Sequence, residues 1–255
     1  MSSTMEASAR LDPESVPLGA QDLRILQAVV EGTAASTGDE YFKTLVRYLA
    51  EAMGARHAFV TEFKAPHSIR TIAFWSNGCV APNIEFDLRN TPCEEVVNGG
   101  FCFYPRGLIE RYPHEHVDSY LGVPLKTRDG AIMGHLAIFD EGALEGDSRR
   151  LSLFRIFAAR AAAELERIRM SQQVNDLFDE APIAYVHEGL DTRFIRANRA
   201  ARRILGITEE EVRGLRGASL VPDTPDAQRR LKEAFESVGK GTDTSGVVLE
   251  LRRKD

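Results

Sequence analysis

The longest regular pattern in this 255-residue sequence is helical and covers residues 147–178. Apolar residues recur there at spacings of three and four, which is the spacing of one helix face. They are Phe154, Phe157, Ala161, Leu165 and Ile168. Because an apolar stripe of this kind can pair with the same stripe of a second copy, we expect a homodimer through this helix. The stripe breaks near residue 171, which predicts a domain junction there.

Two further helical patterns, followed by a series of strand-like runs, precede this helix. The helical patterns cover residues 22–31 and 36–53, and Gly54 ends the second in the way a C-terminal glycine commonly does. The strand-like runs cover residues 56–63, 69–76, 85–88, 100–104, 118–126 and 131–140. Asp129-Gly130 between the last two runs is a strong hairpin signal. These patterns predict an α+β fold with an antiparallel sheet.

A short helix is predicted between the third and fourth strand-like runs. Thr91 is a suitable N-cap, Pro92 suits the first helical position, and Glu94 would complete a capping box. We expect this helix to end at Gly99.

The residues after 171 predict a second α+β unit. Strands are expected over residues 184–188 and 194–197, followed by a helix that ends at Gly206. Thr208 is expected to cap another short helix. Residues 224–238 form an amphipathic helical pattern, and residues 246–252 begin a further strand-like run.

Composition and charge limit the classes of function. The chain has 32 Lys and Arg against 38 Asp and Glu, so its net charge of −6 argues against a direct nucleic acid partner. No run approaches the ~18 apolar residues that would cross a bilayer, so we expect no membrane span. Residues 1–20 lack the basic start and apolar core of a secretory signal and predict a disordered leader. The three cysteines form no C-x-x-C pair, which fits a cytoplasmic location.

Two motifs on successive predicted strands resemble a GAF domain, and the likeness extends over residues 22–170. They are Tyr120-Leu121-Gly122-Val123-Pro124-Leu125 and Gly134-His135-Leu136-Ala137. Three later motifs resemble a PAS domain: Ala181-Pro182-Ile183-Ala184, Phe194-Ile195-Arg196-Ala197-Asn198 and Leu205-Gly206. The expected organisation is a disordered leader (1–20), a GAF sensor domain with a C-terminal signalling helix (21–170) and the N-terminal part of a PAS domain (171–255). By the PAS resemblance, Asn198 ties the start of a helix to the sheet through its side chain.

The resemblance implies the sensory input region of a cytoplasmic bacterial signalling protein, such as a histidine kinase, that is not itself an enzyme. The sequence contains no recognisable output domain, so we expect that domain to lie outside this chain. In GAF domains the ligand sits between the sheet and a covering segment, which corresponds here to residues 91–120, called the cover segment below. A small-molecule effector would alter the packing of this segment, and the change would pass to the helix over residues 147–178. The resemblance does not identify the ligand or any cofactor.

The candidate ligand-binding residues are aromatic, sulfur-containing or imidazole side chains in or near the cover segment. They are Trp75, Cys93, Cys102, Tyr104, Tyr112, His114, His116 and Tyr120. The aromatic residues suit a planar or apolar small molecule. Cys93 begins the predicted helix, whose positive end would lower the pKa of its thiol, whereas Cys102 is expected to be a small buried apolar residue.

Two alternatives stay open at this point. His114 and His116 are separated by one residue in an extended loop, so their imidazoles could share a cation, although no third ligand is defined. A metal or thiol redox sensor would use these two histidines with Cys93 and Cys102. The other alternative is a structural dimerisation module that binds no ligand.

Overall fold

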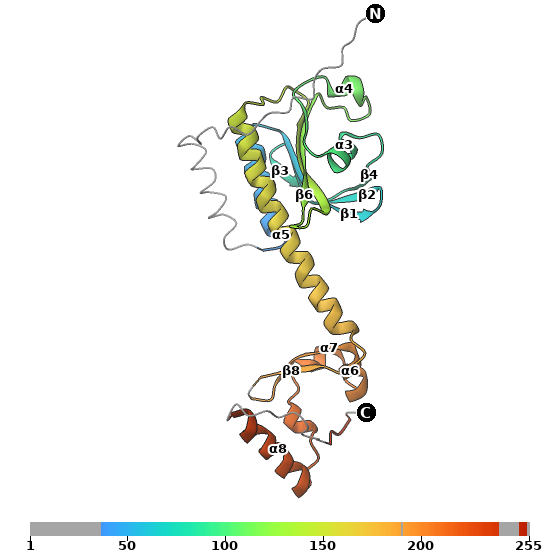
Figure 1. Ribbon diagram of the computed structural model, residues 1–255, viewed down its shortest axis with the longest axis vertical. Helices are drawn as coiled ribbons and strands as arrows, with labels where there is room; N and C mark the ends of the chain where they lie inside the picture. The colour runs from blue at the N-terminus through green and yellow to red at the C-terminus, as the bar shows by residue number, and fades with distance from the viewer. Residues whose placement is uncertain (1–36, 190, 240–249, 254–255) are drawn as a thin grey trace, which may run out of the picture. The chain divides into compact units, whose positions relative to one another are not determined.

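The computed structural model describes residues 37–189, 191–239 and 250–253 (Figure 1). The expected leader over residues 1–20, the expected helix over residues 22–31 and most of the expected strand over residues 246–252 lie outside these ranges. The chain divides into two compact units, one up to Ile168 and one from Arg169. Each unit is described by itself below.

The first unit is built on one antiparallel sheet whose strands differ in length. Its main strand order is β3-β2-β1-β7-β6-β5, and β4 pairs with β2 beside β3. The strands are β1 (His57–Ala65), β2 (Ser68–Ser76), β3 (Cys79–Ala81), β4 (Glu85–Asp87), β5 (Cys102–Tyr104), β6 (Ser119–Lys126) and β7 (Ile132–Asp140). The predicted antiparallel sheet is confirmed, and β3 is a strand that the sequence patterns did not indicate.

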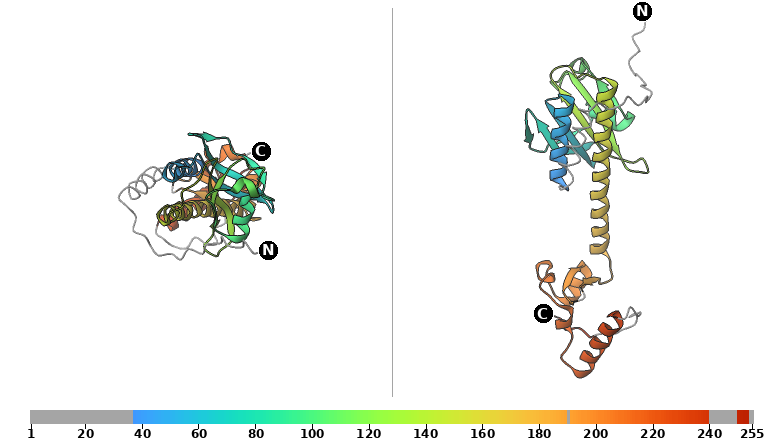
Figure 2. Two further views of the ribbon diagram at one scale, coloured as in Figure 1. Left: turned by 90° about the horizontal axis from the view of Figure 1, so that it is seen from above. Right: turned by 90° about the vertical axis from the view of Figure 1, so that its left-hand side faces the viewer.

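Helix α2 (Asp39–Met53) and the first part of α5 (Ser148–Glu180), up to Ile168, lie side by side on one face of this sheet (Figure 2). The apolar stripe of α2 is buried, and Gly54 ends the helix in the left-handed conformation at φ 65°. The stripe predicted for self-pairing is also used here, because Phe154, Phe157 and Leu165 of α5 are buried in the core of this unit. These residues are therefore not available to a second copy, which corrects the expected pairing surface.

The exposed apolar residues of α5 begin later in the helix, within the second unit. Met170, Val174 and Leu177 are 57%, 62% and 68% exposed. Their spacing of four and then three residues places them on one helix face. A second copy would therefore meet this shorter stripe rather than the one expected from the sequence.

The cover segment places its two helices on the opposite face of the sheet. It contains α3 (Pro92–Gly99), β5 and the short helix α4 (Leu108–Arg111), which the sequence patterns did not indicate. The predicted start and end of α3 are confirmed, but the predicted capping box is wrong. The Thr91 hydroxyl donates instead to the Leu88 carbonyl at 2.6 Å, and Glu94 accepts from the Asn90 backbone N–H at 3.0 Å. The loop before α3 competes for both side chains.

The second unit contains β8 (Val186–Glu188) paired with β9 (Phe194–Ala197), followed by helices α6 (Arg199–Leu205), α7 (Glu209–Val212), a 3-10 turn (Gly217–Leu220) and α8 (Pro225–Gly239). The expected role of Asn198 is confirmed. Its side-chain oxygen accepts from the backbone N–H groups of Ala201 and Tyr185, each at 2.9 Å, and its amide donates to the Ile183 carbonyl at 2.8 Å. Residues 250–252 are not in a strand.

The described part of the chain contains no helix with the length and apolar character needed to span a membrane.

Candidate functional site

The cover segment brings together five of the eight residues predicted to bind a ligand. Cys93 lies on α3, Cys102 and Tyr104 on β5, Tyr112 directly after α4, and Tyr120 on β6. All five pack in the apolar cluster on this face of the sheet. The sequence prediction that these residues share one region is therefore supported by their positions, although no ligand is present to show what they bind.

Cys93 and Tyr120 form the buried centre of this group. The Tyr120 hydroxyl donates to the Cys93 sulfur at 3.5 Å, and the tyrosine ring reaches across the strand over Gly122. A Cβ atom at Gly122 would come within 2.6 Å of the Tyr120 hydroxyl and 2.7 Å of Val96, so only glycine leaves room for this arrangement.

The Cys93 thiol does not have the lowered pKa that the sequence suggested. Burial raises the pKa of Cys93 to about 12, which outweighs any effect of its place at the start of α3. The expected lowering of this pKa is therefore wrong. Burial and the neighbouring Glu95 carboxylate raise the pKa of Cys102 to about 12 as well, in line with its expected burial.

Glu95 of α3 joins the parts of the cover segment through a hydrogen-bond cluster that the sequence reasoning missed. Its carboxylate accepts from the Tyr112 hydroxyl at 2.6 Å and the Tyr104 hydroxyl at 2.9 Å, and it pairs with Arg111 at 2.7 Å. The Cys102 thiol lies 3.6 Å from the same carboxylate. Burial acts to raise the pKa of Glu95, but the hydrogen bonds from the two tyrosines and the charge of Arg111 lower it overall. One carboxylate thus holds α3, β5 and α4 together.

His114 and His116 lie apart from this cluster. Both side chains are exposed, and His116 adopts a left-handed backbone conformation at φ 55°. Within the described residues no group of three or more His, Cys, Asp and Glu side chains is arranged to hold a metal ion. Glu115 between them is half-buried, and burial raises the pKa of its carboxyl group.

Trp75 is not part of the cover face. It packs on the other face of the sheet, against the core formed with α2 and α5. Successive residues of a strand point to opposite faces, and its neighbour Phe74 is the one that packs toward the cover side. The prediction of a common lining that includes Trp75 is therefore wrong.

An aromatic layer occupies the cover face around Phe59 of β1. Phe59 contacts the rings of Phe139 at 5.6 Å, Phe74 at 6.3 Å and Phe86 at 6.4 Å. The imidazole of His135 meets Phe59 edge to face at 5.2 Å. These aromatic residues were not among the predicted ligand-binding set, although alternation along β7 puts His135 on the same face as Ala137 and Phe139.

His135 is fully buried, and its Nε2 atom has no hydrogen-bond partner in the described structure. The other ring nitrogen, Nδ1, lies 2.8 Å from the Thr61 hydroxyl. Burial lowers the pKa of His135 to about 3, so the ring is neutral at pH 7. A buried polar atom without a partner is unusual enough to need an explanation.

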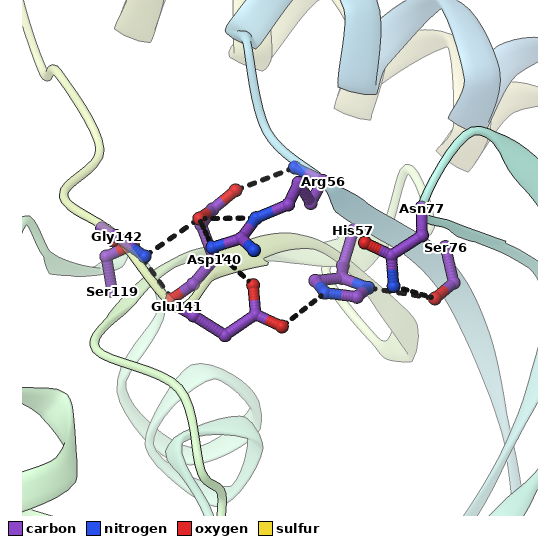
Figure 3. Close-up of polar contacts among 8 residues, drawn as sticks. All are labelled: Arg56, His57, Ser76, Asn77, Ser119, Asp140, Glu141 and Gly142. Atoms are coloured by element: carbon purple, nitrogen blue, oxygen red, sulfur yellow. Dashed lines mark hydrogen bonds and ion pairs between the residues drawn. The ribbon is translucent and has the colours of Figure 1, made fainter.

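A polar cluster lies next to this layer, where β1 begins and β2 and β7 end (Figure 3). His57 stacks on Phe139 at 4.6 Å, while its ring nitrogens lie 3.0 Å from the Ser76 hydroxyl and 3.3 Å from the Glu141 carboxylate. Arg56 donates to Asp140 through its side chain at 2.7 Å and its backbone N–H at 2.8 Å. These contacts fix the ends of β1, β2 and β7 together.

The cover segment also contacts the beginning of α5 and the loop that leads to it. The Leu144 backbone N–H donates to the Pro105 carbonyl at 3.1 Å. The Phe103 ring lies against Gly146, where a Cβ atom would approach it to 2.2 Å, and the Arg155 guanidinium of α5 lies 5.5 Å from the Phe101 ring centre. Residues 101–105 therefore have a direct physical connection to α5.

Comparison with known proteins agrees with this arrangement. The GAF domain family matches residues 37–165, and a PAS fold matches residues 179–254. No curated protein sequence matches the chain.

Among solved structures, the GAF domain of an Acinetobacter phosphoenolpyruvate-protein phosphotransferase is similar at 15% identity and a TM-score of 0.51, over 61% of this chain and 99% of that one. The chromophore-binding domain of a bacteriophytochrome from R. palustris is similar at 8% identity and a TM-score of 0.51, over 60% of this chain and 62% of that one. At these identities the likeness extends to the fold alone. Because the family match covers half of the sequence and the sheet, helices and cover segment agree with it, this chain belongs to the GAF domain family.

Proposed function

We propose that this chain is the sensory input region of a cytoplasmic bacterial signalling protein, such as a histidine kinase. It binds a small effector beneath the cover segment and carries no catalytic activity of its own. The GAF and PAS matches support a role as a signalling sensor. The bound effector, the output domain outside this chain and the homodimer are parts of this proposal.

The observation that carries the proposal is the contact between residues 101–105 and the start of α5. The Arg155–Phe101 contact joins the cover segment to α5, and the Leu144–Pro105 hydrogen bond and the Phe103–Gly146 contact join it to the loop directly before α5. The Glu95 cluster joins the same part of the cover segment to α3. An effector that moves α3 would therefore also displace contacts at the start of α5, which is the differential interaction that a two-state relay requires.

A homodimer is the second element of the proposal. Met170, Val174 and Leu177 form an exposed apolar stripe on α5, and a second copy of the same stripe is a suitable occupant. The same stripe would also serve a ligand-free dimerisation module, which is the alternative function. The redox alternative has less support, because the raised pKa values of Cys93 and Cys102 leave both thiols protonated at neutral pH.

Native mass spectrometry of the purified chain, combined with metal analysis, tests the proposal. We expect a dimer with a bound organic molecule and no stoichiometric metal. Removal of that molecule should increase amide hydrogen exchange in α3, in residues 101–105 and in the first turns of α5 together. The dimerisation module would be favoured by a dimer that has no bound molecule and whose amide hydrogen exchange is unchanged when metabolites from a cell extract are added.

A further inference from the structure

We propose that the aromatic layer around Phe59 is a binding site for a planar, uncharged aromatic molecule whose N–H or O–H group donates a hydrogen bond to Nε2 of His135. The inference rests on the proposed function and specifies the chemical class of its effector. It is carried by the buried imidazole without a partner and by the rings that surround it.

The hydrogen bonds of Thr61 determine what Nε2 can do. The Thr61 hydroxyl oxygen accepts from the His135 backbone N–H at 3.0 Å and lies 3.2 Å from the His135 carbonyl. The hydroxyl has one proton, and donating it to the carbonyl leaves the oxygen free to accept from Nδ1–H at 2.8 Å. This arrangement satisfies all three contacts, whereas donation to Nδ1 would leave the carbonyl contact unmade. We therefore assign the proton to Nδ1, which leaves Nε2 with a lone pair.

That lone pair points away from Thr61 into apolar surroundings. The Phe59 ring meets the imidazole at 5.2 Å, and burial alone, with no contribution from a neighbouring charge, lowers the pKa of His135. An acceptor buried in such surroundings gains most from a neutral donor, because a charged ligand would lose its hydration without a compensating charge. The required ligand is thus uncharged and carries an N–H or O–H group.

The rings around His135 favour a planar aromatic framework for the rest of the ligand. Phe59 is buried, but Phe74, Phe86 and Phe139 are only half-buried and bound the layer toward solvent. The Phe74 and Phe139 rings lie 6.1 Å apart with 29° between their planes, and the His57 ring stacks on Phe139 at 4.6 Å and lies 6.5 Å from Phe74. An aromatic ligand can replace these ring contacts as it displaces one of the half-buried rings, whereas an aliphatic ligand would lose the offset and edge-to-face geometry.

Isothermal titration calorimetry of the full chain with two matched probes tests this assignment. 2-Naphthol is planar and uncharged and has one O–H donor, and 2-methoxynaphthalene has the same rings without the donor. We expect 2-naphthol to bind about tenfold more tightly to the native protein, the effect of one net hydrogen bond. His135→Leu should remove this preference, and His114→Leu, which changes an exposed imidazole of the same unit, should retain it.

A spectroscopic measurement on the unmodified chain keeps the proposal testable if His135→Leu does not fold. In protein labelled with ¹⁵N-histidine, 2-naphthol should shift the Nε2 resonance of one neutral imidazole in the direction of a newly accepted hydrogen bond. Equal affinities for the two probes, or a preference that survives in a folded His135→Leu variant, would overturn the assignment.

The possible failures separate this inference from the proposed function. If neither probe binds while native mass spectrometry finds another small molecule, the ligand class is wrong and the sensor function stands. If neither probe binds, no native molecule is found and the aromatic layer is protected only in the dimer, a second copy occupies the layer and both proposals fail.

Discussion

The Tyr112 hydroxyl donates to the Glu95 carboxylate at 2.6 Å, and this contact joins the loop after α4 to helix α3. The same carboxylate holds Tyr104 of β5 and Arg111 of α4. Because one side chain connects three elements of the cover segment, a change at Glu95 should loosen all of them together.

We expect Glu95→Gln to destabilise the protein by about 1 kcal/mol, because hydrogen bonds to a charged acceptor are stronger than those to an amide and this group is partly exposed. Glu110→Gln on the exposed side of α4 is the matched control. Urea denaturation gives the stability, and hydrogen exchange should show faster opening of α3, β5 and α4 in the Glu95 variant. Unchanged exchange in these elements would contradict the role of Glu95.

His135 should make stability depend on pH in the acidic range. Its pKa is lowered from 6.5 to about 3 in the folded protein, so the unfolded chain binds a proton below pH 6.5 that the folded chain does not bind. The stability present above pH 6.5 is therefore lost as the pH falls toward 3, by about 2 kcal/mol at pH 5.

The substitution His135→Leu should remove this part of the pH dependence and, at pH 7, should be neutral or stabilising by about 1 kcal/mol, because it eliminates a buried atom without a partner. Urea denaturation between pH 5 and 8 measures both effects. An identical pH profile in the two proteins would show that His135 is not responsible.

Gly122 should not tolerate a side chain. A Cβ atom there would lie 2.6–2.8 Å from Tyr120 and Val96, so Gly122→Ala should cost about 1–3 kcal/mol through overpacking. Gly99→Ala in α3 has no atom within 4 Å of the new Cβ and should be neutral or slightly stabilising. Thermal denaturation of the pair distinguishes a steric effect from a general sensitivity of the cover segment.

The stripe on α5 should decide whether the protein dimerises. Leu177→Glu places a charge within the apolar contact between copies, so we expect it to convert a dimer to a monomer. Gln172→Glu introduces the same charge at an exposed position on the opposite side of the helix and should leave the dimer intact. Light scattering after size exclusion measures the mass of both, and a dimer that persists in Leu177→Glu would place the interface elsewhere.

The three cysteines should differ in reactivity. Cys79 is exposed, whereas Cys93 and Cys102 are buried with pKa values raised to about 12. A thiol reagent at pH 7 should therefore modify one cysteine per folded chain quickly and the other two only after unfolding. Mass spectrometry of the labelled peptides identifies the sites, and rapid labelling of Cys93 would restore the redox alternative.

Much of the fold could be predicted because its signals are local. The stripe of α2 with the glycine after it and the hairpin at Asp129-Gly130 depend on residues close in sequence, whereas the side-chain role of Asn198 was implied by the resemblance to PAS domains. The site could be predicted only in part. Five of the predicted residues share the cover face, but Trp75 points to the other face and His114 and His116 are exposed.

The sequence by itself determined most of the described helices and strands, β3 and α4 excepted, because spacing, caps and turn residues act over a few positions. Only the tertiary structure decided which side chains from different segments come into contact. The first part of α5 has the spacing of a pairing helix, yet its stripe packs on the sheet of its own unit. Glu95 collects donors from three elements, and Nε2 of His135 is left without one. These outcomes depend on which groups, far apart in sequence, come into contact and on how completely each is desolvated. Local sequence patterns indicate neither.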